Sequence, residues 1–338
     1  MKQMISFFAI IIVLPLSFAT TIMAAPADFD FYKGKLVTYI VATKPGGGYD
    51  SYARTIGKYM QKYIPGATVI VKNVPGAGHI IGANETYLAK PDGLTIGTFN
   101  TGLIYSQIVG QEGIRFNLSK YSWIGKANSE TRVLIVGLKS PYRTLKDVME
   151  SKEPLKLPTA GVGTQDYNEM VIMSAALPVK FQPVPGYAGR EGEMAILRGE
   201  VSGCLGSYVG LQGLIATKEC RILMQYGNQQ RIPGLEKVPH INSINVAPKM
   251  KSMITLINSI VSIGRLTAAP PGVPPGRLQV LREAYKKALA DPELINYAEK
   301  LQLDFDPSYG DDVQKMVTES VNQPAENLKM LREIIKLP

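Results

Sequence analysis

Apolar runs rich in β-branched residues alternate along the chain with segments in which apolar residues recur at helical spacing. The first kind of run predicts strands at 36–42, 68–71, 94–99, 132–138, 155–160, 181–184, 201–205, 221–226 and 260–268. The second predicts helices at 51–63, 82–89, 144–151, 167–176, 191–198, 278–289, 292–301 and 311–335. Strands that alternate with helices are typical of α/β proteins, so the pattern predicts that class.

The first 25 residues have the features of a secretory signal peptide. Lys2 gives a positive start, an apolar run follows over residues 5–19, and small residues stand at Ala24, Ala25 and Ala27. The apolar run is shorter than the ~20 residues of a membrane-spanning helix, which is the alternative. We therefore expect cleavage near Ala24–Ala27 and a mature chain in the periplasm.

Charge and composition narrow the possible partners. The 338 residues include 37 Lys and Arg against 28 Asp and Glu, a formal net charge of +9. That excess suits an anionic ligand, although it is equally a general property of exported proteins. Because the basic residues are scattered, without interleaved aromatic residues, nucleic acid is not an expected partner.

The few cysteines and histidines limit metal and redox chemistry. Two histidines and two cysteines offer few ligands for zinc, so no metal and no cofactor is expected. In an oxidising compartment Cys204 and Cys220 form either a disulfide or two buried thiols, and the sequence leaves both open.

Two glycine-rich loops each stand between a predicted strand and a predicted helix. Residues 45–50 read Pro-Gly-Gly-Gly-Tyr-Asp, with Asp50 or Ser51 as the expected cap of the helix, and residues 161–166 read Gly-Val-Gly-Thr-Gln-Asp. Glycine lets backbone N–H groups turn toward a ligand, and a helix N-terminus favours an anion. The alternative is an ordinary tight turn, but the pair of loops predicts two positive helix ends that hold one carboxylate or two.

Enzyme signatures are missing from the sequence. No Gly-Lys-Ser/Thr ends a phosphate loop, no Gly-x-Ser-x-Gly elbow is present, and residues 76–82 have the wrong spacing for a dinucleotide fingerprint. His79 and His240 are isolated from acidic residues along the chain, although His79 adjoins a glycine-rich loop. An exported hydrolase, one alternative, would need a nucleophile beside a base, so we predict a protein that is not an enzyme.

Six segments together resemble the substrate-binding receptors of tripartite tricarboxylate transporters, the Bug-type extracytoplasmic solute receptors. The resemblance covers roughly 34–325, and its order and spacing are more specific than any single segment. The segments that carry it are 45–54 (PGGGYDSYAR), 69–78 (VIVKNVPGAG), 90–97 (KPDGLTIG), 160–164 (AGVGT), 198–201 (RGEV) and 268–274 (AAPPGVP).

The resemblance implies the fold of type II periplasmic binding proteins, in which two α/β lobes are joined by two crossover segments. Lobe 1 would be 34–130 plus 251–338, and lobe 2 would be 131–250. The implied ligand-binding residues are Gly46, Gly47, Gly48, Tyr49, Asp50, Asn100, Thr101, Gly161, Val162, Gly163, Thr164, Gln165, Asp166 and Tyr187. Asp166 departs from the family pattern, and would either face an amino or hydroxyl group of the ligand or cap its helix.

The function implied is that of a receptor, not an enzyme. It would close its two lobes on a small organic carboxylate and deliver it to the permease subunits of a tripartite transporter in the membrane. A carrier that presents the ligand to a membrane sensor is the alternative that the sequence leaves open.

Overall fold

The computed structural model describes residues 26–187, 190–228 and 232–336. The expected signal peptide, 1–25, lies outside the described residues. Within those ranges, no helix is both long enough and apolar enough to cross a membrane.

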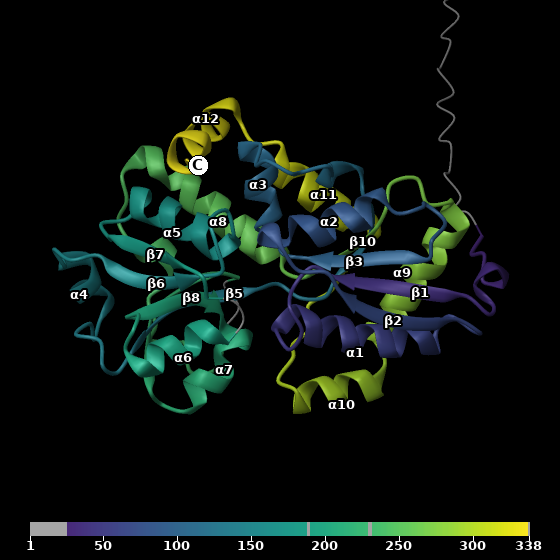
Figure 1. Cartoon of the computed structure of the whole chain (residues 1–338), viewed down its shortest axis with the longest axis horizontal. Helices are drawn as coiled ribbons and strands as arrows, with labels where there is room; N and C mark the ends of the chain where they lie inside the picture. The colour runs from purple at the N-terminus through teal and green to yellow at the C-terminus, as the bar shows by residue number, and fades with distance from the viewer. Residues whose placement is uncertain (1–25, 188–189, 229–231, 337–338) are drawn as a thin grey trace, which may run out of the picture.

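Figure 1 shows the chain as two α/β halves side by side, each with its own strands and covering helices. The helices are α1 (Gly48–Lys62), α2 (Ile80–Leu88), α3 (Leu103–Val109), α4 (Leu145–Glu150), α5 (Gln165–Ala176), α6 (Glu191–Arg198), α7 (Tyr208–Ala216), α8 (Lys251–Ile263), α9 (Pro275–Leu289), α10 (Pro292–Lys300), α11 (Gly310–Val321) and α12 (Ala325–Ile334). The predicted α/β class and two-lobed architecture are confirmed.

The sheet of the first half has the strand order β11-β4-β10-β3-β1-β2. Its strands are β1 (Leu36–Val41), β2 (Thr68–Asn73), β3 (Thr95–Phe99), β4 (Ser122–Lys126), β10 (Leu266–Ala269) and β11 (Ser308–Tyr309). β1 pairs in parallel with β2 and β3, whereas β10 runs antiparallel between β3 and β4. The parallel strands place the starts of α1 and α3 at one edge of the sheet, where β1 and β3 end.

The second half contains two smaller sheets. β5 (Thr131–Gly137) lies antiparallel between β8 (Gly203–Ser207) and β9 (Cys220–Gly227). β6 (Leu155–Thr159) pairs in parallel with β7 (Phe181–Pro185). All seven residues of β5 are buried, as expected for a central strand with both faces covered.

One apolar core spans the two halves. It joins Phe99 and Trp123 of the first sheet to Leu134 of the second, through Ile257 of α8 and Val317 of α11. α8 packs against β9 and α5, and α12 packs against α3 and α5. The C-terminal helices therefore cross from one half to the other, as Figure 1 shows along the top of the molecule.

Two predicted elements are wrong in detail. Residues 260–268 were expected to be one extended strand, but α8 continues to Ile263, Gly264 ends it, and β10 begins at Leu266. The buried residues of α8 follow helical spacing, which the β-branched tail of the segment conceals. The expected helix at 311–335 is two helices, α11 and α12, because Pro324 cannot continue α11.

The two chain crossings between the halves lie against each other. The amide of Ala127 donates to the carbonyl of Arg265 at 2.8 Å, and the amide of Arg265 donates to the carbonyl of Asn128 at 3.4 Å. Gly264 has φ +69°, a conformation that favours glycine. This pairing holds β4 and β10 together just where the chain passes to and from the second half.

Candidate functional site

The first glycine loop leads directly into α1. The helix begins at Gly48 after an extended Gly47, and no side chain caps its first turn. Gly46, with φ +84°, makes the turn into this geometry. The backbone N–H groups of the first turn therefore supply the positive end of the helix dipole without a side-chain acceptor at the cap position.

Asp50 does not cap α1 in the expected way. Its buried carboxylate turns back into the loop and accepts hydrogen bonds from Gly46 N (2.9 Å), Arg54 Nε (2.9 Å) and Asn73 Nδ2 (2.9 Å). Burial alone would raise the pKa of Asp50, but these hydrogen bonds outweigh it and hold the pKa below its ordinary value. The side chain of Asp50 thus fixes the loop, and its backbone N–H is the group left for a ligand.

The second glycine loop leads in the same way into α5, which begins at Gln165, two residues before the predicted start. The Thr164 hydroxyl donates to Gly161 O at 2.7 Å and lies 2.8 Å from Thr159 Oγ1, so it does not cap the helix. Gly163 has φ +78°. Both glycine loops consequently end in a helix whose first turn lacks a side-chain cap.

A third segment connects the two loops. A Cβ placed on Gly78 would lie 3.6 Å from the carbonyl oxygen of Gly163, and the ring of His79 meets that of Tyr49 edge-on at 6.2 Å. His79 itself has φ +82°, which is strained for a residue with a side chain. The structure therefore brings the loops at 46–50 and 161–165 to one junction between the two halves.

The start of α3 closes another side of this junction. Asn100 Oδ1 accepts from Gly102 N at 2.6 Å, so its carbonyl is engaged within its own turn. A Cβ on Gly102 would stand 2.6 Å from the Cβ of Gln165, so the helix starts of α3 and α5 touch. The hydroxyl of Thr101 is buried and has no hydrogen-bond partner among the described residues.

Besides Asp50, four more buried charged residues lie at the junction, and the sequence interpretation missed these four. They are Glu130, Arg132, Glu169 and Arg265. Arg132 Nε donates to Glu169 Oε2 at 2.8 Å, and Arg265 Nη2 lies 3.4 Å from Glu130 Oε1. Pairing of opposite charges partly offsets the desolvation cost of burying them, whereas an isolated buried charge would be strongly unfavourable.

Arg265 links this cluster to the first glycine loop. Its guanidinium lies over the rings of Tyr52, at 4.3 Å, and Tyr49, at 5.2 Å. A Cβ on Gly48 would come within 2.8 Å of Arg265 Nη2, so glycine at 48 leaves the room that the guanidinium occupies. A positive side chain thus stands behind the positive end of α1.

Several polar atoms at the junction are buried without a hydrogen-bond partner in the described part of the chain. They are Tyr49 OH, His79 Nδ1, Thr101 Oγ1, Tyr105 OH, Glu130 Oε2, Gln165 Oε1, Asn168 Oδ1 and Arg265 Nε. Buried polar groups are nearly always hydrogen-bonded, so a group of exceptions in one place is typical of a ligand site. Burial also raises the pKa of the Tyr49 hydroxyl, which therefore stays protonated and able to donate.

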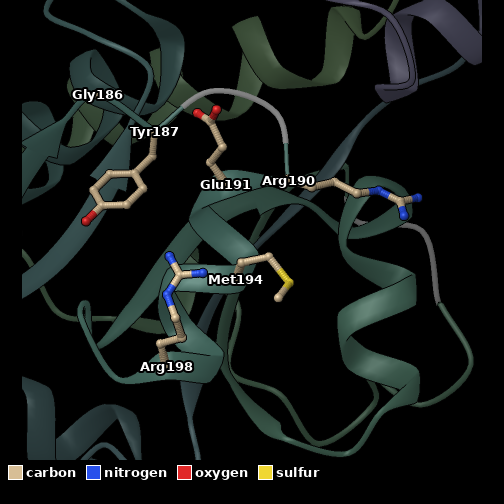
Figure 2. A pocket seen from close by; sticks show the side chains of 6 residues that line it. All are labelled: Gly186, Tyr187, Arg190, Glu191, Met194 and Arg198. Atoms are coloured by element: carbon tan, nitrogen blue, oxygen red, sulfur yellow. The ribbon is translucent and has the colours of Figure 1, made fainter.

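The remaining predicted residues lie at the margin of the junction or outside it. Val162 is exposed. Asp166 is half-buried in the first turn of α5, where the helix dipole stabilises a carboxylate. Tyr187 lines a pocket of about 490 Å³ at the start of α6, away from the junction. The pocket is also lined by Gly186, Arg190, Glu191, Met194 and Arg198. Figure 2 shows Tyr187 and Arg190 directed to opposite sides of it. None of its lining residues belongs to the two glycine loops.

The two cysteines are free thiols. Cys204 in β8 pairs with Ile135 of β5, and Cys220 in β9 pairs with Gly137 on the other side of β5. β5 lies between the two strands that carry them. Within the described ranges no group of three or more histidine, cysteine or acidic side chains is arranged to hold a metal ion.

Two α/β halves joined by two crossings, with the uncapped starts of α1 and α5 both facing the Gly78–His79 segment between them, have the architecture of a two-lobed solute-binding protein. Residues 52–333 match the model of the "Tripartite tricarboxylate transporter family receptor". The match spans most of the chain, which therefore belongs to this family, and the resemblance seen in the sequence is confirmed. The family consists of solute receptors, not enzymes.

Similar proteins agree with this assignment. A "UPF0065 protein in tcbD-tcbE intergenic region" of Pseudomonas sp. strain P51 is 26% identical over 286 residues, 83% of this chain and 82% of that protein. MatC of Rhodopseudomonas palustris with bound malate superposes with a TM-score of 0.71 at 19% identity, over 89% of this chain and 99% of MatC. An R. palustris protein with adipate gives a TM-score of 0.73 at 16% identity, over 89% of this chain and 98% of that one. At such identities the two structures support the shared fold alone.

Proposed function

We propose that the chain is an exported periplasmic receptor that captures a small organic carboxylate and delivers it to the permease subunits of a tripartite transporter. The observation that carries the proposal is that the segment Gly78–His79 lies against both uncapped helix starts, at Tyr49 of α1 and at Gly163 before α5, beside the Arg265 guanidinium. The solved structures of similar fold that hold malate and adipate support the same ligand class.

The proposed binding groups are mainly backbone N–H groups. They come from Gly47, Gly48, Tyr49 and Asp50 in the first loop, from Gly163 and Gln165 in the second, and from Asn100 and Thr101 at the start of α3. The N–H group of Gly46 is held by Asp50, and those of Gly161 and Thr164 are bonded within their own loop. Fixed N–H donors hold a carboxylate in a defined orientation, and the dipoles of two helices add favourable potential. Contacts from both halves would favour the closed arrangement once the ligand is present.

A thermal-shift screen tests the proposal. Purified mature chain would be heated with dicarboxylates, tricarboxylates, amino acids and aromatic acids, and with sugars and simple cations as controls. A ligand at about 100 times its Kd adds about 2.7 kcal/mol of stability, a rise of a few degrees for a chain of this size. Stabilisation by carboxylates supports the proposal, and stabilisation by sugars or cations alone overturns it.

Delivery to a membrane permease is a separate part of the proposal and has its own experiment. The tagged receptor, loaded with the carboxylate found in the screen, would be used to capture detergent-solubilised inner-membrane proteins. Recovery of large multi-span permease subunits supports transport. Recovery of a membrane signalling protein in their place would overturn delivery but not carboxylate binding.

A further inference from the structure

The buried charge cluster at the junction consists of two ion pairs. Arg132 and Glu169 are well hydrogen-bonded, whereas Arg265 and Glu130 are not. In the first, Glu169 accepts from Arg132 Nε at 2.8 Å, from Tyr226 OH at 2.6 Å and from Gln165 Nε2 at 2.7 Å. Both oxygens of Glu169 are therefore engaged at ordinary hydrogen-bond distances. Protein groups alone therefore satisfy the Glu169 carboxylate in this ion pair.

The other ion pair, Glu130 and Arg265, is bonded much more loosely. Both side chains are 3% exposed, and their closest atoms, Glu130 Oε1 and Arg265 Nη2, are 3.4 Å apart. Arg265 Nη1 donates to Asn128 Oδ1 at 3.3 Å and Nη2 to Ser207 Oγ at 3.4 Å, both long, and Nε has no partner. Glu130 Oε2 is 3.8 Å from Arg132 Nη1, beyond hydrogen-bond distance, and has no hydrogen-bond partner in the described chain.

Three of the unpartnered atoms at the junction, Glu130 Oε2, Gln165 Oε1 and Asn168 Oδ1, can only accept a hydrogen bond. Gln165 Nε2 is held by the Glu169 carboxylate, so Gln165 Oε1 is an acceptor without a donor. Asn168 lies one turn further along α5. Its Nδ2 donates to Gly163 O, so Asn168 Oδ1 is also an acceptor without a donor. An all-acid ligand would leave such oxygens unsatisfied, whereas a group with several N–H donors would satisfy them.

We propose that Glu130 and Arg265 form a two-charge recognition site, in which Arg265 binds a carboxylate of the ligand and Glu130 binds a protonated amine on the same molecule. The inference rests on the proposed function and narrows the ligand class to amino-carboxylates. Arg265 contacts residues of both halves, Tyr49 and Tyr52 on one side and Glu130 and Ser207 on the other. A zwitterion bound beside the pair would replace the loose contact between Glu130 and Arg265 and give each charge its missing partner.

Isothermal titration with matched ligand pairs tests the inference. Each pair differs only in amine against hydroxyl, such as L-aspartate against L-malate and L-glutamate against 2-hydroxyglutarate. We expect the amine of at least one pair to bind 10-fold or more tightly than its hydroxyl partner. We expect Glu130→Gln to weaken the amine ligand at least 10-fold and the hydroxyl ligand less than 3-fold, whereas Arg265→Lys weakens both.

A matched control and a folding check accompany the variants. Glu219→Gln makes the same change of charge at an exposed position after α7 and should bind like the wild type. Circular dichroism and melting temperature report whether Glu130→Gln folds. The wild-type comparison of amine and hydroxyl ligands needs no variant, so it stands even if the variant does not fold.

The outcomes separate this inference from the proposed function. Preference for the amine in the wild type, lost in Glu130→Gln, supports the inference. Equal or tighter binding of the hydroxyl or unsubstituted acids overturns it and leaves the carboxylate receptor intact. Failure of every carboxylate, with or without an amine, overturns the proposed function itself.

Discussion

Gly264 and Asn128 are packed so tightly that any side chain at 264 would overlap the carbonyl oxygen of Asn128. Each residue lies on one of the two chain crossings between the halves. Gly264 also has φ +69°, and the same crossings carry Glu130 and Arg265. One close backbone contact therefore sets the position of two charged side chains at the junction.

Gly264→Ala should destabilise the protein by about 3 kcal/mol or more, because the new methyl group adds backbone strain to an overlap with main-chain atoms. Chemical denaturation measures the change. Gly213→Ala in α7 is the matched control, since a Cβ there meets no atom within 4 Å. The control should be neutral or more stable by up to about 1 kcal/mol. Equal stability of the two variants would contradict the tight crossing.

Asp50→Asn should lower stability by about 1–2 kcal/mol at pH 7, because a neutral amide accepts more weakly from Arg54 and Gly46. The pKa of Asp50 is lowered in the folded chain, so its contribution is present above the unfolded pKa of about 3.9 and is lost as the pH falls through the folded value. Urea denaturation at pH 7 and at pH 3 measures the free energy of unfolding. The difference in this free energy between wild type and Asp50→Asn should be smaller at pH 3 than at pH 7. Asp312→Asn, at an exposed position in the first turn of α11, is the control. A stability difference between Asp50→Asn and wild type that does not depend on pH would refute this role of Asp50.

His79 should remain neutral throughout the physiological range, because burial lowers its pKa from 6.5 to about 4. The unfolded chain takes up a proton below about pH 6.5 while the folded chain does not, so stability declines as the pH falls from 6.5 toward 4. Proton NMR of the imidazole ring measures the titration directly. The chain has only two histidines, and His240→Asn removes the other signal. A midpoint near 6.5 would show that the ring is not buried.

Cys204 and Cys220 should stay reduced and should differ in reactivity. Cys204 is buried, and burial raises the pKa of both thiols, so thiolate is scarce at pH 7. An Ellman titration of the native protein should show slow reaction at the half-buried Cys220 and almost none at Cys204, with two thiols released in denaturant. No thiol in denaturant would mean a disulfide between the two residues and would contradict the free thiols of the structure.

Much of the fold could be predicted from the sequence because its signals are local. Apolar spacing located β1, α1 and β3, and the glycine runs located the turns that begin α1 and α5. The segment at 260–268 was misread because the β-branched tail of α8 joins directly to β10. The packing of α8 against β9 and α5 makes these residues helical, and Gly264 ends the helix.

The charged part of the site could not be predicted in this way. Glu130 and Arg265 are 135 positions apart, and each reads as an ordinary polar residue beside a strand. Their pairing depends on the antiparallel contact of β10 with β4, which no local pattern reveals. Asp50 was misassigned for a related reason, since its partner Asn73 lies at the end of the neighbouring strand.

Titration of the mature receptor with carboxylates tests the central claim most directly, with Gly48→Ala as its partner experiment. A methyl group at 48 would push the Arg265 guanidinium from its place behind α1. We predict saturable binding of one carboxylate per chain, weakened at least 10-fold in Gly48→Ala while the melting temperature of the free protein stays within a few degrees. Absence of binding for every carboxylate, or undiminished affinity in Gly48→Ala, would contradict the claim that the helix starts and Arg265 together hold the anion.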